Sequence, residues 1–372
     1  MARLVLTWLS TAAGGAERSV KELASALAAA GHEVVLVWWD ATRVGTDALA
    51  DHRIVVHRVA DLPGYRQAVR DALDVGTRVV VICTHRTMLV DVPLARCHAV
   101  SVIVVMRALL LAGGRLRVLD EVTGQLVGRA PHELDWDKLA EADCWVGVST
   151  AATRCLMAYA PRGIWVERIY NGVPVDAQPS PRGLSRVRRL GVAARAEPWK
   201  RIDRLITAFA TLPGDLTVQM SLHVFGDGPE LEGLRRQACG LGVADRTIFH
   251  GHTDPGWTHR CDVLVSTCEI EAFGRVVIEA GAAGVPQIVP DQGGTAELVI
   301  PGMTGLHYDV NDPTALTCAL LDVAAWSPAD YYRHATAAHV YARRFSLATC
   351  AAAYAQLVVD LLIDRRGENA IA

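Results

Sequence analysis

Short apolar segments alternate with amphipathic ones along most of the chain, and this alternation predicts strands joined by helices. After Gly15, apolar side chains recur at helical spacing as far as Ala28, and Gly31 supplies a C-terminal stop. Such alternation favours an α/β fold in which helices cover both faces of a parallel sheet. The strands expected in the first half span residues 3–9, 33–38, 53–59, 78–83, 100–105, 145–148 and 165–170.

A proline-rich break at residues 173–183 leads into a second alternating half and predicts an interdomain hinge. Strands are expected there at residues 192–194, 222–225, 247–250, 263–266, 287–289 and 305–308. Helices are expected at 201–212, 229–240, 275–283, 295–300, 312–325, 328–344 and 346–364, followed by a frayed end. We therefore expect two Rossmann-like domains, residues 1–173 and 174–345, and a C-terminal segment, residues 346–372.

Length and composition fit two ordinary globular domains. The chain has 372 residues, 51% of them apolar, and its net charge of −3 gives no sign of a nucleic-acid partner. The longest apolar run, residues 99–112, is interrupted by Arg107 and is too short to span a bilayer. Nine scattered cysteines lack metal or disulfide spacing and suggest free thiols in a reducing compartment. We expect a cytoplasmic protein without a transmembrane segment.

Residues 266–305 carry the strongest signal for chemistry. An apolar strand at 262–266 runs into a polar loop, and a helix opens near Gly274. A helix that begins at the carboxyl end of a strand presents free N–H groups and the positive end of its dipole, which suits a phosphate group. Glu271 in the loop and Glu279, two turns further on, offer carboxylates that could grip hydroxyls on either side of that phosphate. The layout predicts a sugar-nucleotide site.

Lys200 stands out because lysine is rare in this chain, accounting for three of its 37 basic residues. A compact ammonium group makes a point-charge contact with phosphate that the planar guanidinium of arginine does not reproduce. Lys200 follows the first strand expected in the second half and lies five residues beyond Arg195. We therefore expect a chemical reason for lysine at this position.

Several short motifs occur in the order and spacing found in the retaining glycosyltransferases of family 4, which this chain resembles. The segment from Glu271 through Phe273 and Gly274 to Glu279 is similar to that family's Glu-x7-Glu element. The other matching segments are Gly14–Glu17, Gly31–Val34, Asn171–Val173 and Phe225–Pro229. The resemblance covers nearly the whole chain. It implies the GT-B architecture, in which two Rossmann-like domains with parallel sheets face an interdomain cleft and the last helix, here 346–364, crosses back to the N-terminal domain.

The resemblance also implies roles for residues of the second half. Arg195 and Lys200 would contact the donor diphosphate, Glu271 the donor sugar, and Glu279 the ribose hydroxyls. Two fixed cations stabilise the charge that develops on a departing nucleoside diphosphate.

The departing phosphate would also meet the N–H groups of the loop and first helical turn, from Phe273 and Gly274 to Val276. Because the cations and the helix dipole take the role that a metal ion plays in other transferases, neither a metal nor a cofactor is expected.

Three further features have two interpretations each. Arg275 is either a phosphate or sugar contact or an ordinary residue of the first helical turn. Gly226 and Asp227 either wall the base pocket or form a plain strand-to-helix turn. Gly14 and Gly15 would let the backbone approach a phosphate closely, yet they do not complete the G-x-G-x-x-G fingerprint, which disfavours a dinucleotide-dependent oxidoreductase.

The acceptor half departs from the family pattern at one position. Many relatives carry a histidine at the end of the strand that here spans residues 100–105, whereas this chain has Met106 and Arg107. His85, at the carboxyl end of the neighbouring strand, is the nearest substitute by position. His85 and Arg107 are therefore the acceptor-side candidates, although a lone histidine is more often structural.

These features together predict a retaining, metal-independent hexosyltransferase. It would move a sugar from a nucleoside-diphosphate sugar, with a UDP-sugar favoured, to an acceptor hydroxyl on a small metabolite or glycan. Two alternatives stay open: another GT-B enzyme, such as a sugar-nucleotide epimerase or a phosphorylase, and a non-catalytic sugar-nucleotide-binding protein.

Overall fold

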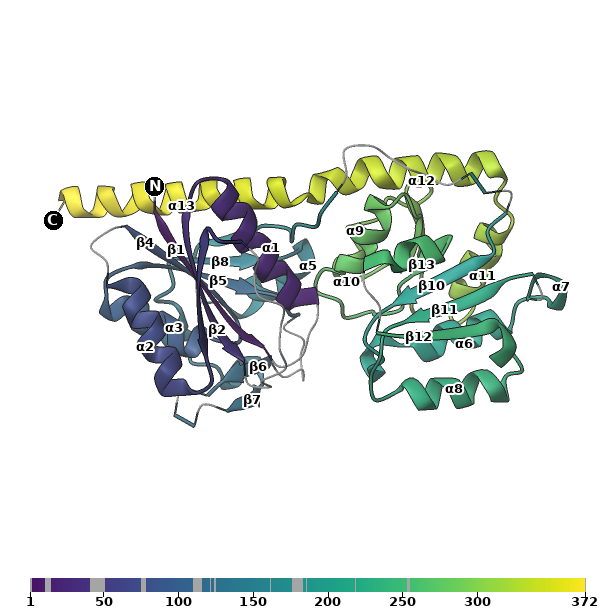
Figure 1. Cartoon of the computed structure of the whole chain (residues 1–372), viewed down its shortest axis with the longest axis horizontal. Coiled ribbons are helices and arrows are strands. Elements are labelled where there is room, and N and C mark those ends of the chain that lie inside the picture. Colours follow the sequence, from purple (N-terminus) through teal and green to yellow (C-terminus); the bar gives the residue numbers. More distant parts are fainter. Residues whose placement is uncertain are drawn as a thin grey trace. The chain divides into compact units, whose positions relative to one another are not determined.

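The structure is a computed structural model, and it divides the chain into two compact units (Figure 1). Unit 1 comprises Met1–Gly172 and Leu347–Ala372, and unit 2 comprises Val173–Ser346. The residues described are 2–10, 15–40, 51–74, 78–109, 116–120, 122–123, 125–160, 162–175, 183–184, 186–217, 219–252 and 255–371.

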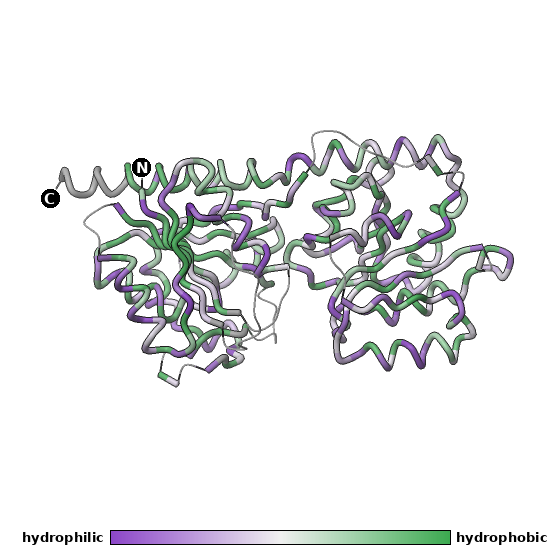
Figure 2. The backbone as a smooth tube through the Cα atoms, viewed as in Figure 1, coloured by the Kyte–Doolittle hydropathy of each residue, from purple (hydrophilic) through white to green (hydrophobic). Residues whose placement is uncertain are grey.

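Unit 1 is built on a seven-stranded parallel sheet in the order β3-β2-β1-β4-β5-β8-β9. Every residue of β4 and β5 is buried, as expected for central parallel strands, and Figure 2 shows the middle of this unit as strongly hydrophobic. The strands are β1 (Arg3–Ser10), β2 (Glu33–Asp40), β3 (Ile54–Val59), β4 (Val79–Thr84), β5 (Ser101–Met106), β8 (Cys144–Gly147) and β9 (Val166–Arg168). The helices are α1 (Gly15–Ala29), α2 (Leu62–Leu73), α3 (Met88–Cys97), α4 (Trp136–Leu139), α5 (Thr150–Tyr159) and α13 (Leu347–Ile371), with a 3₁₀ turn η1 (Pro131–Glu133).

Unit 2 repeats this plan with a six-stranded parallel sheet in the order β12-β11-β10-β13-β14-β15. Figure 1 shows α8 on one side of this sheet and α9 and α12 on the other. The strands are β10 (Arg189–Ala193), β11 (Ser221–Phe225), β12 (Thr247–Gly251), β13 (Val263–Val265), β14 (Gln287–Pro290) and β15 (Gly305–Tyr308). The helices are α6 (Ile202–Ala210), α7 (Gly214–Thr217), α8 (Leu231–Gly240), α9 (Arg275–Ala282), α10 (Gly293–Ala296), α11 (Ala315–Ala324) and α12 (Pro328–Ala342), and the 3₁₀ turns are η2 (Pro198–Lys200), η3 (Ala244–Arg246), η4 (Pro255–Arg260) and η5 (Arg343–Phe345).

The α/β prediction is confirmed, and each of the thirteen expected strands is present with small shifts at its ends. The helix expected at 295–300 is wrong, because α10 ends at Ala296 after a single turn. The chain end expected to be frayed belongs instead to α13, which continues to Ile371. Among the described helices, none combines the length and the apolar character that crossing a membrane requires.

An antiparallel hairpin in unit 1, β6 (Leu116–Leu119) with β7 (Leu126–Arg129), was not predicted. Its turn is organised by Asp120, whose Oδ1 accepts the N–H groups of Val122 and Thr123, at 3.1 and 2.8 Å. The Oδ2 of Asp120 accepts from Arg129, at 3.0 Å. Arg117 interrupts β6 and Gly128 interrupts β7, so neither short strand is the continuous apolar run that marks the buried strands.

A fully buried carboxyl group lies in the core of unit 1 beneath β1. Asp91 accepts hydrogen bonds from the hydroxyls of Tyr65 and Thr7, at 2.8 and 2.6 Å. Burial raises the pKa of Asp91 to about 6, although hydrogen bonds from Thr7, Thr87 and Tyr65 act in the opposite direction. The folded protein therefore holds this proton at a pH where an unfolded carboxyl, with its pKa near 3.8, has lost it.

We expect unit 1 to become less stable as the pH rises, because Asp91 then loses this proton. Its contribution is complete below about pH 4 and is lost as the pH passes through 6. Asp91→Asn does not titrate, so the unfolding free energy of the wild type relative to the variant should fall by on the order of 3 kcal/mol between pH 4 and 7. Denaturant titrations of both proteins at pH 4, 5.5 and 7 measure this difference, and a difference that stays constant would contradict the assignment.

Candidate functional site

The site residues predicted in the second half lie in loops and in helix α9, which follow the strands at one edge of the unit 2 sheet. Because neighbouring strands are parallel, the loops that follow β10, β11, β13 and β14 all leave the carboxyl edge. The sheet order places β11 on one side of β10 and β13 on the other. Connections therefore diverge on either side of β10, and ligands of open α/β sheets bind outside the carboxyl ends of the strands at such a switch point.

Lys200 and Glu271 meet across this switch point. Lys200 ends η2 in the loop after β10, and Glu271 lies in the loop after β13. The Nζ of Lys200 donates to the Oε2 of Glu271, and the two side chains are 22% and 25% exposed. The hydroxyl of Thr267 donates to the carbonyl of Lys200, at 2.7 Å, and fixes the backbone beneath the ammonium group. Two residues 71 positions apart are thus in direct contact.

Lys200 is charged at neutral pH. Burial alone would lower the pKa of its ammonium group, but the carboxylate of Glu271 raises it, and the result lies above the usual lysine value. Burial raises the pKa of the neighbouring Cys268 thiol to about 11, so this group stays neutral. Lys200 therefore provides a fixed positive charge at the carboxyl edge of the sheet.

The loop that carries Arg195 is held by backbone contacts with the loop after β11. The N–H of Ala194 donates to the carbonyl of Phe225, and that of Ala196 donates to the carbonyl of Asp227, both at 3.0 Å. Gly226, with φ of 131°, lies so close that a Cβ there would be 2.0 Å from the carbonyl oxygen of Ala194. A glycine is therefore required at position 226 to seat the Arg195 loop.

Within this loop the guanidinium of Arg195 is exposed and pairs with Glu197, at 2.8 Å. Asp227 uses its carboxylate to accept the N–H of Gly228, at 2.7 Å. Gly226 and Asp227 thus have a structural task in the loop. Their role in lining a base pocket stays a prediction.

The loop of Glu271 is packed on a pair of glycines after β14. The N–H of Gly294 donates to the carbonyl of Glu271, at 2.7 Å, and a Cβ at position 294 would lie 2.1 Å from the carbonyl oxygen of Ala272. Gly274, with φ of 91°, caps α9, and a Cβ there would lie 2.4 Å from the Cγ2 of Thr295. Side chains larger than hydrogen at positions 274 and 294 would push this loop away from its place.

Helix α9 begins directly after this loop and orients Glu279. The Nε and Nη2 of Arg275 both lie 3.2 Å from the Oε1 of Glu279, one turn further along the helix. Arg275 therefore orients the Glu279 carboxylate. This role is a third interpretation of Arg275, beside the two proposed from the sequence. Phe273 is buried edge-on against Phe345, with ring centroids 6.1 Å apart, while Val276 in the first turn is half-buried.

In unit 1, His85 and Arg107 lie next to each other at the carboxyl edge of the sheet. They follow β4 and β5, and the backbone N–H of Arg107 points at the Nδ1 of His85 across 3.4 Å. The guanidinium of Arg107 also donates to the side-chain oxygen of Asn171. Gly15 begins α1, whereas Gly14 lies outside the described residues.

His85 is a neutral group at physiological pH. Burial lowers its pKa to about 3, and the guanidinium groups of Arg86 and Arg107 act in the same direction. With Nδ1 facing an N–H donor, the ring proton belongs on Nε2. His85 is therefore suited to donate a hydrogen bond and unsuited to carry a positive charge.

Two side-chain contacts in unit 2 were not predicted from the sequence. Arg204 on α6 pairs with Glu269, beside the Lys200–Glu271 contact, and so doubles the ion pairing across the switch point. The rings of Phe225 and His250 stack at 4.6 Å beneath the Gly226 turn. The sequence could have indicated these contacts only through the position of the residues, which lie near the ends of strands or the start of a helix at the same edge of the sheet.

The Asp-x-Asp pattern, a metal-ligand motif of other transferases, is present in the chain at Asp135 and Asp137. There, Asp135 serves as the N-cap of α4 and accepts the N–H of Lys138, at 3.1 Å. Within the described ranges, no three His, Cys, Asp or Glu side chains gather closely enough to hold a metal ion.

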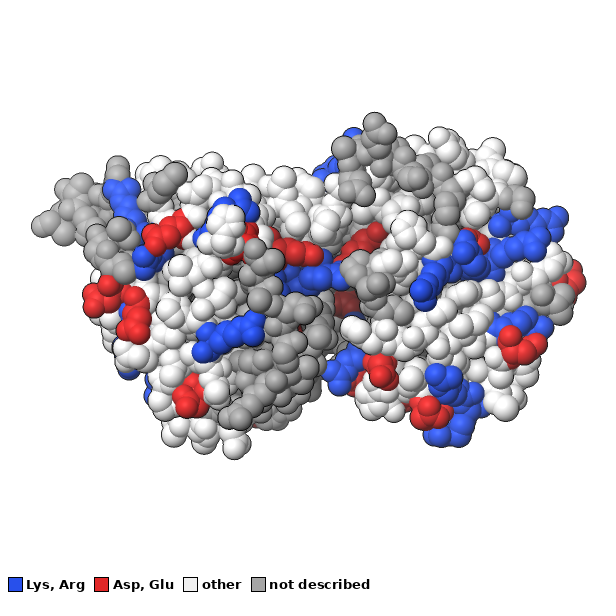
Figure 3. Space-filling model, viewed as in Figure 1, with Lys and Arg blue, Asp and Glu red and all other residues white. Residues whose placement is uncertain are grey.

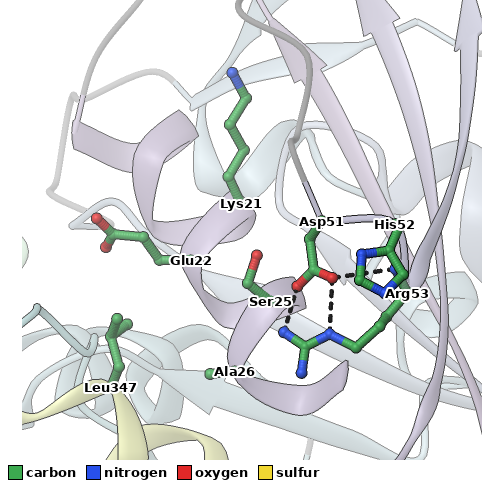
Figure 4. A pocket seen from close by; sticks show the side chains of 8 residues that line it. All are labelled: Lys21, Glu22, Ser25, Ala26, Asp51, His52, Arg53 and Leu347. Carbon is green, nitrogen blue, oxygen red and sulfur yellow. Dashed lines mark hydrogen bonds and ion pairs between the residues drawn. The ribbon is translucent and has the colours of Figure 1, made fainter. Parts of the chain in front are cut away.

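A cavity of about 810 Å³ in unit 1 lies between α1, the turn before β3 and the start of α13 (Figure 4). Its charged groups are already paired. Lys21 contacts Glu17 at 3.0 Å, Glu22 contacts Arg18 at 3.7 Å, and Figure 4 shows Asp51 and Arg53 bound to each other. The cavity therefore offers a ligand little uncompensated charge. Its lining residues are Lys21, Glu22, Ser25, Ala26, Asp51, His52, Arg53 and Leu347.

Both halves of the chain match models of known protein families. Residues 13–177 match the model Glycosyltransferase Family 4, and residues 185–328 match Glycosyl transferases group 1. The chain belongs to glycosyltransferase family 4. This family-4 chain also has the GT-B fold. It superposes on HepE from Anabaena, solved in complex with UDP and glucose, with a TM-score of 0.76 at 20% identity, over 96% of this chain and 99% of HepE.

Curated relatives of this family-4 chain include two mycobacterial proteins. A GDP-mannose-dependent alpha-(1-6)-phosphatidylinositol monomannoside mannosyltransferase from Mycolicibacterium smegmatis is 31% identical over 52% of this chain, which spans 59% of that protein's length. A glycogen synthase from Mycobacterium tuberculosis is 28% identical over 96% of this chain and 92% of its own length.

Proposed function

We propose that the chain transfers a sugar from a nucleoside-diphosphate sugar to an acceptor hydroxyl, with retention of the anomeric configuration and without a metal ion. The observation that carries this proposal is the Lys200–Glu271 contact at the switch point of unit 2. It joins a fixed cation to a hydroxyl-binding carboxylate, the two groups that a diphosphate linked to a sugar requires. Family membership and the UDP-bound structural neighbour support the same conclusion.

In the proposed reaction, the bond between the anomeric carbon and the diphosphate oxygen breaks, and its electron pair stays on the leaving phosphate. The ammonium of Lys200 and the exposed guanidinium of Arg195 stabilise the charge that develops there. The acceptor oxygen attacks the anomeric carbon from the side that the phosphate leaves. The acceptor proton passes to the leaving phosphate, so that no protein nucleophile is needed.

The two carboxylates position the donor on either side of its diphosphate. Glu271 accepts hydrogen bonds from the sugar hydroxyls, and Glu279, held by Arg275, accepts from the ribose hydroxyls. The first turn of α9 directs its N–H groups and dipole at the phosphate, and Gly274 permits a close approach.

The acceptor side is assigned to unit 1. The neutral His85 would donate its Nε2–H to a hydroxyl of the acceptor, next to Arg107. A small metabolite or glycan is the proposed acceptor class. We propose UDP-sugars as donors, while the GDP-mannose-dependent relative makes GDP-sugars the first comparison.

We expect one nucleotide family to stabilise the chain whether or not EDTA is present. The test is a thermal-shift panel of UDP, GDP, dTDP and ADP and their sugar conjugates. A ligand at a hundred times its dissociation constant stabilises by about 2.7 kcal/mol, which produces a visible shift for a domain of this size. A shift that requires a divalent cation would contradict metal independence, and no shift with any nucleotide would contradict the proposed donor site.

A further inference from the structure

A second cavity, of about 550 Å³, lies at the opposite edge of the unit 2 sheet from the Lys200–Glu271 contact. Its walls come from the amino-terminal starts of β10 and β11 and from the residues just before β12 and β13. The lining residues are Gly183, Leu184, Arg186, Arg188, Arg189, Gln219, Met220, Ser221, Asp245, Arg246, Ile248 and Asp262. The full length of the strands lies between the two edges of the sheet, so this cavity is distinct from the proposed donor site.

Arginine is concentrated in this cavity. Four of its twelve lining residues are arginine, against 34 of 372 in the whole chain. Figure 3 shows Lys and Arg side chains in a band over β10 in unit 2. The composition of the chain therefore does not account for this density of positive charge.

The two acidic residues of the cavity pair with two of its four arginines, Asp262 with Arg189 and Asp245 with Arg246. The buried carboxylate of Asp262 is saturated, since it accepts the backbone N–H groups of Arg188 and Arg189, both at 2.9 Å, and the guanidinium of Arg189, at 2.7 Å. Asp245 is exposed and lies 3.8 Å from Arg246. Asp262 thus serves to fix the backbone that carries the arginines.

Two guanidinium groups remain uncompensated. Among the residues that the structure describes, neither Arg186 nor Arg188 has an acidic side chain within 4.0 Å, and the buried Nε of Arg246 has no hydrogen-bond partner. The unit 1 cavity is the opposite case, because each of its charged side chains is paired. Unpaired, exposed arginine side chains that line a concave space offer the forked donors that suit a phosphate group.

We propose that this cavity binds a small phosphate-bearing molecule. Arg186 and Arg188 would grip the phosphate oxygens, and the half-buried Arg246 would add positive charge to the wall of the cavity. Ser221 adds a hydroxyl that already shares a hydrogen bond with His223, at 2.9 Å. The concave shape and a volume that suits a metabolite favour a soluble phosphate ester over a flat membrane surface.

The test is a calorimetric titration of the full chain with inorganic phosphate at low ionic strength. It uses an Arg195→Ala/Lys200→Ala background, which removes the proposed donor-site cations. We expect phosphate binding to persist in this background and to weaken by about tenfold or more when Arg186→Ala and Arg188→Ala are added. The backbone N–H of Arg188 keeps its bond to Asp262 in these variants, so the fold is expected to survive.

The matched control is Arg236→Ala, which removes an exposed arginine of α8 outside the cavity and should leave phosphate affinity unchanged. The proposal is overturned if no phosphate binding is detected, if Arg186→Ala/Arg188→Ala binds as tightly as its parent, or if Arg236→Ala weakens binding equally. It is also overturned if phosphate does not bind while phosphatidylglycerol vesicles bind through Arg186 and Arg188, because the cavity would then be a membrane contact. None of these outcomes depends on whether sugar transfer is observed.

Discussion

Lys200→Ala is expected to lower kcat for sugar transfer by about 10²–10³-fold while leaving the fold intact. The ammonium group is the charged partner of Glu271 at the switch point, and in the proposed reaction it stabilises charge on the leaving diphosphate. Removing one preorganised group that stabilises developing charge has a cost of this size. Because Lys200 is partly exposed and its carbonyl, which Thr267 binds, stays in place, stability should change little.

The measurement is steady-state kinetics with the donor that the thermal-shift panel identifies. Lys200→Arg is the matched variant, since it keeps the charge and replaces the compact ammonium with a planar fork. We expect Lys200→Arg to recover only part of the lost activity. Turnover close to that of the wild type in Lys200→Ala would remove Lys200 from the mechanism.

Gly294→Ala and Gly233→Ala should change the stability of unit 2 in opposite directions. A methyl group at position 294 would lie 2.1 Å from the carbonyl oxygen of Ala272 and 2.8 Å from the backbone nitrogen of Phe273. Backbone atoms cannot rotate away as a flexible side chain can, so we expect Gly294→Ala to destabilise by about 2–3 kcal/mol. It should also weaken donor binding, because the loop of Glu271 rests on this glycine.

Gly233 is the control, because it lies inside α8 with open space where a Cβ would be. Alanine there restricts the unfolded chain and favours the helix, so stability should rise by up to about 1 kcal/mol. Differential scanning calorimetry measures the melting temperatures of both variants and of the wild type. Equal melting temperatures for Gly294→Ala and the wild type would show that the loop of Glu271 is not fixed by this contact.

Sequence patterns predicted the sheets well because their central strands are buried on both faces. Strands such as β4 and β5 are continuous apolar runs bounded by polar turns, a signal that needs no tertiary information. The β6–β7 hairpin escaped this signal because Arg117 and Gly128 interrupt its short strands, and the helix expected at 295–300 is wrong because α10 is a single turn that ends at Ala296. Their boundaries are set by contacts such as those of Asp120 and Gly294.

The candidate site was predicted in part, through motifs that mark the ends of strands. Lys200 and Glu271 could be named from sequence, whereas their direct contact depends on the order of strands in the sheet. The Arg204–Glu269 pair was missed because each residue, taken alone, is typical of an exposed helix or loop. The bond between Arg275 and Glu279 follows from helical spacing, but its role in orienting a carboxylate emerges only from the position of α9 at the sheet edge.

The most direct test of the proposed donor site is a calorimetric titration of UDP, in EDTA, into the wild type, Lys200→Ala and Glu271→Gln. Lys200 attracts the diphosphate, whereas Glu271 binds the sugar and partly neutralises Lys200. The account predicts that UDP binds the wild type, that Lys200→Ala weakens binding about tenfold or more, and that Glu271→Gln binds UDP as tightly or more tightly. Absence of UDP binding, or an equal loss of affinity in both variants, would contradict it.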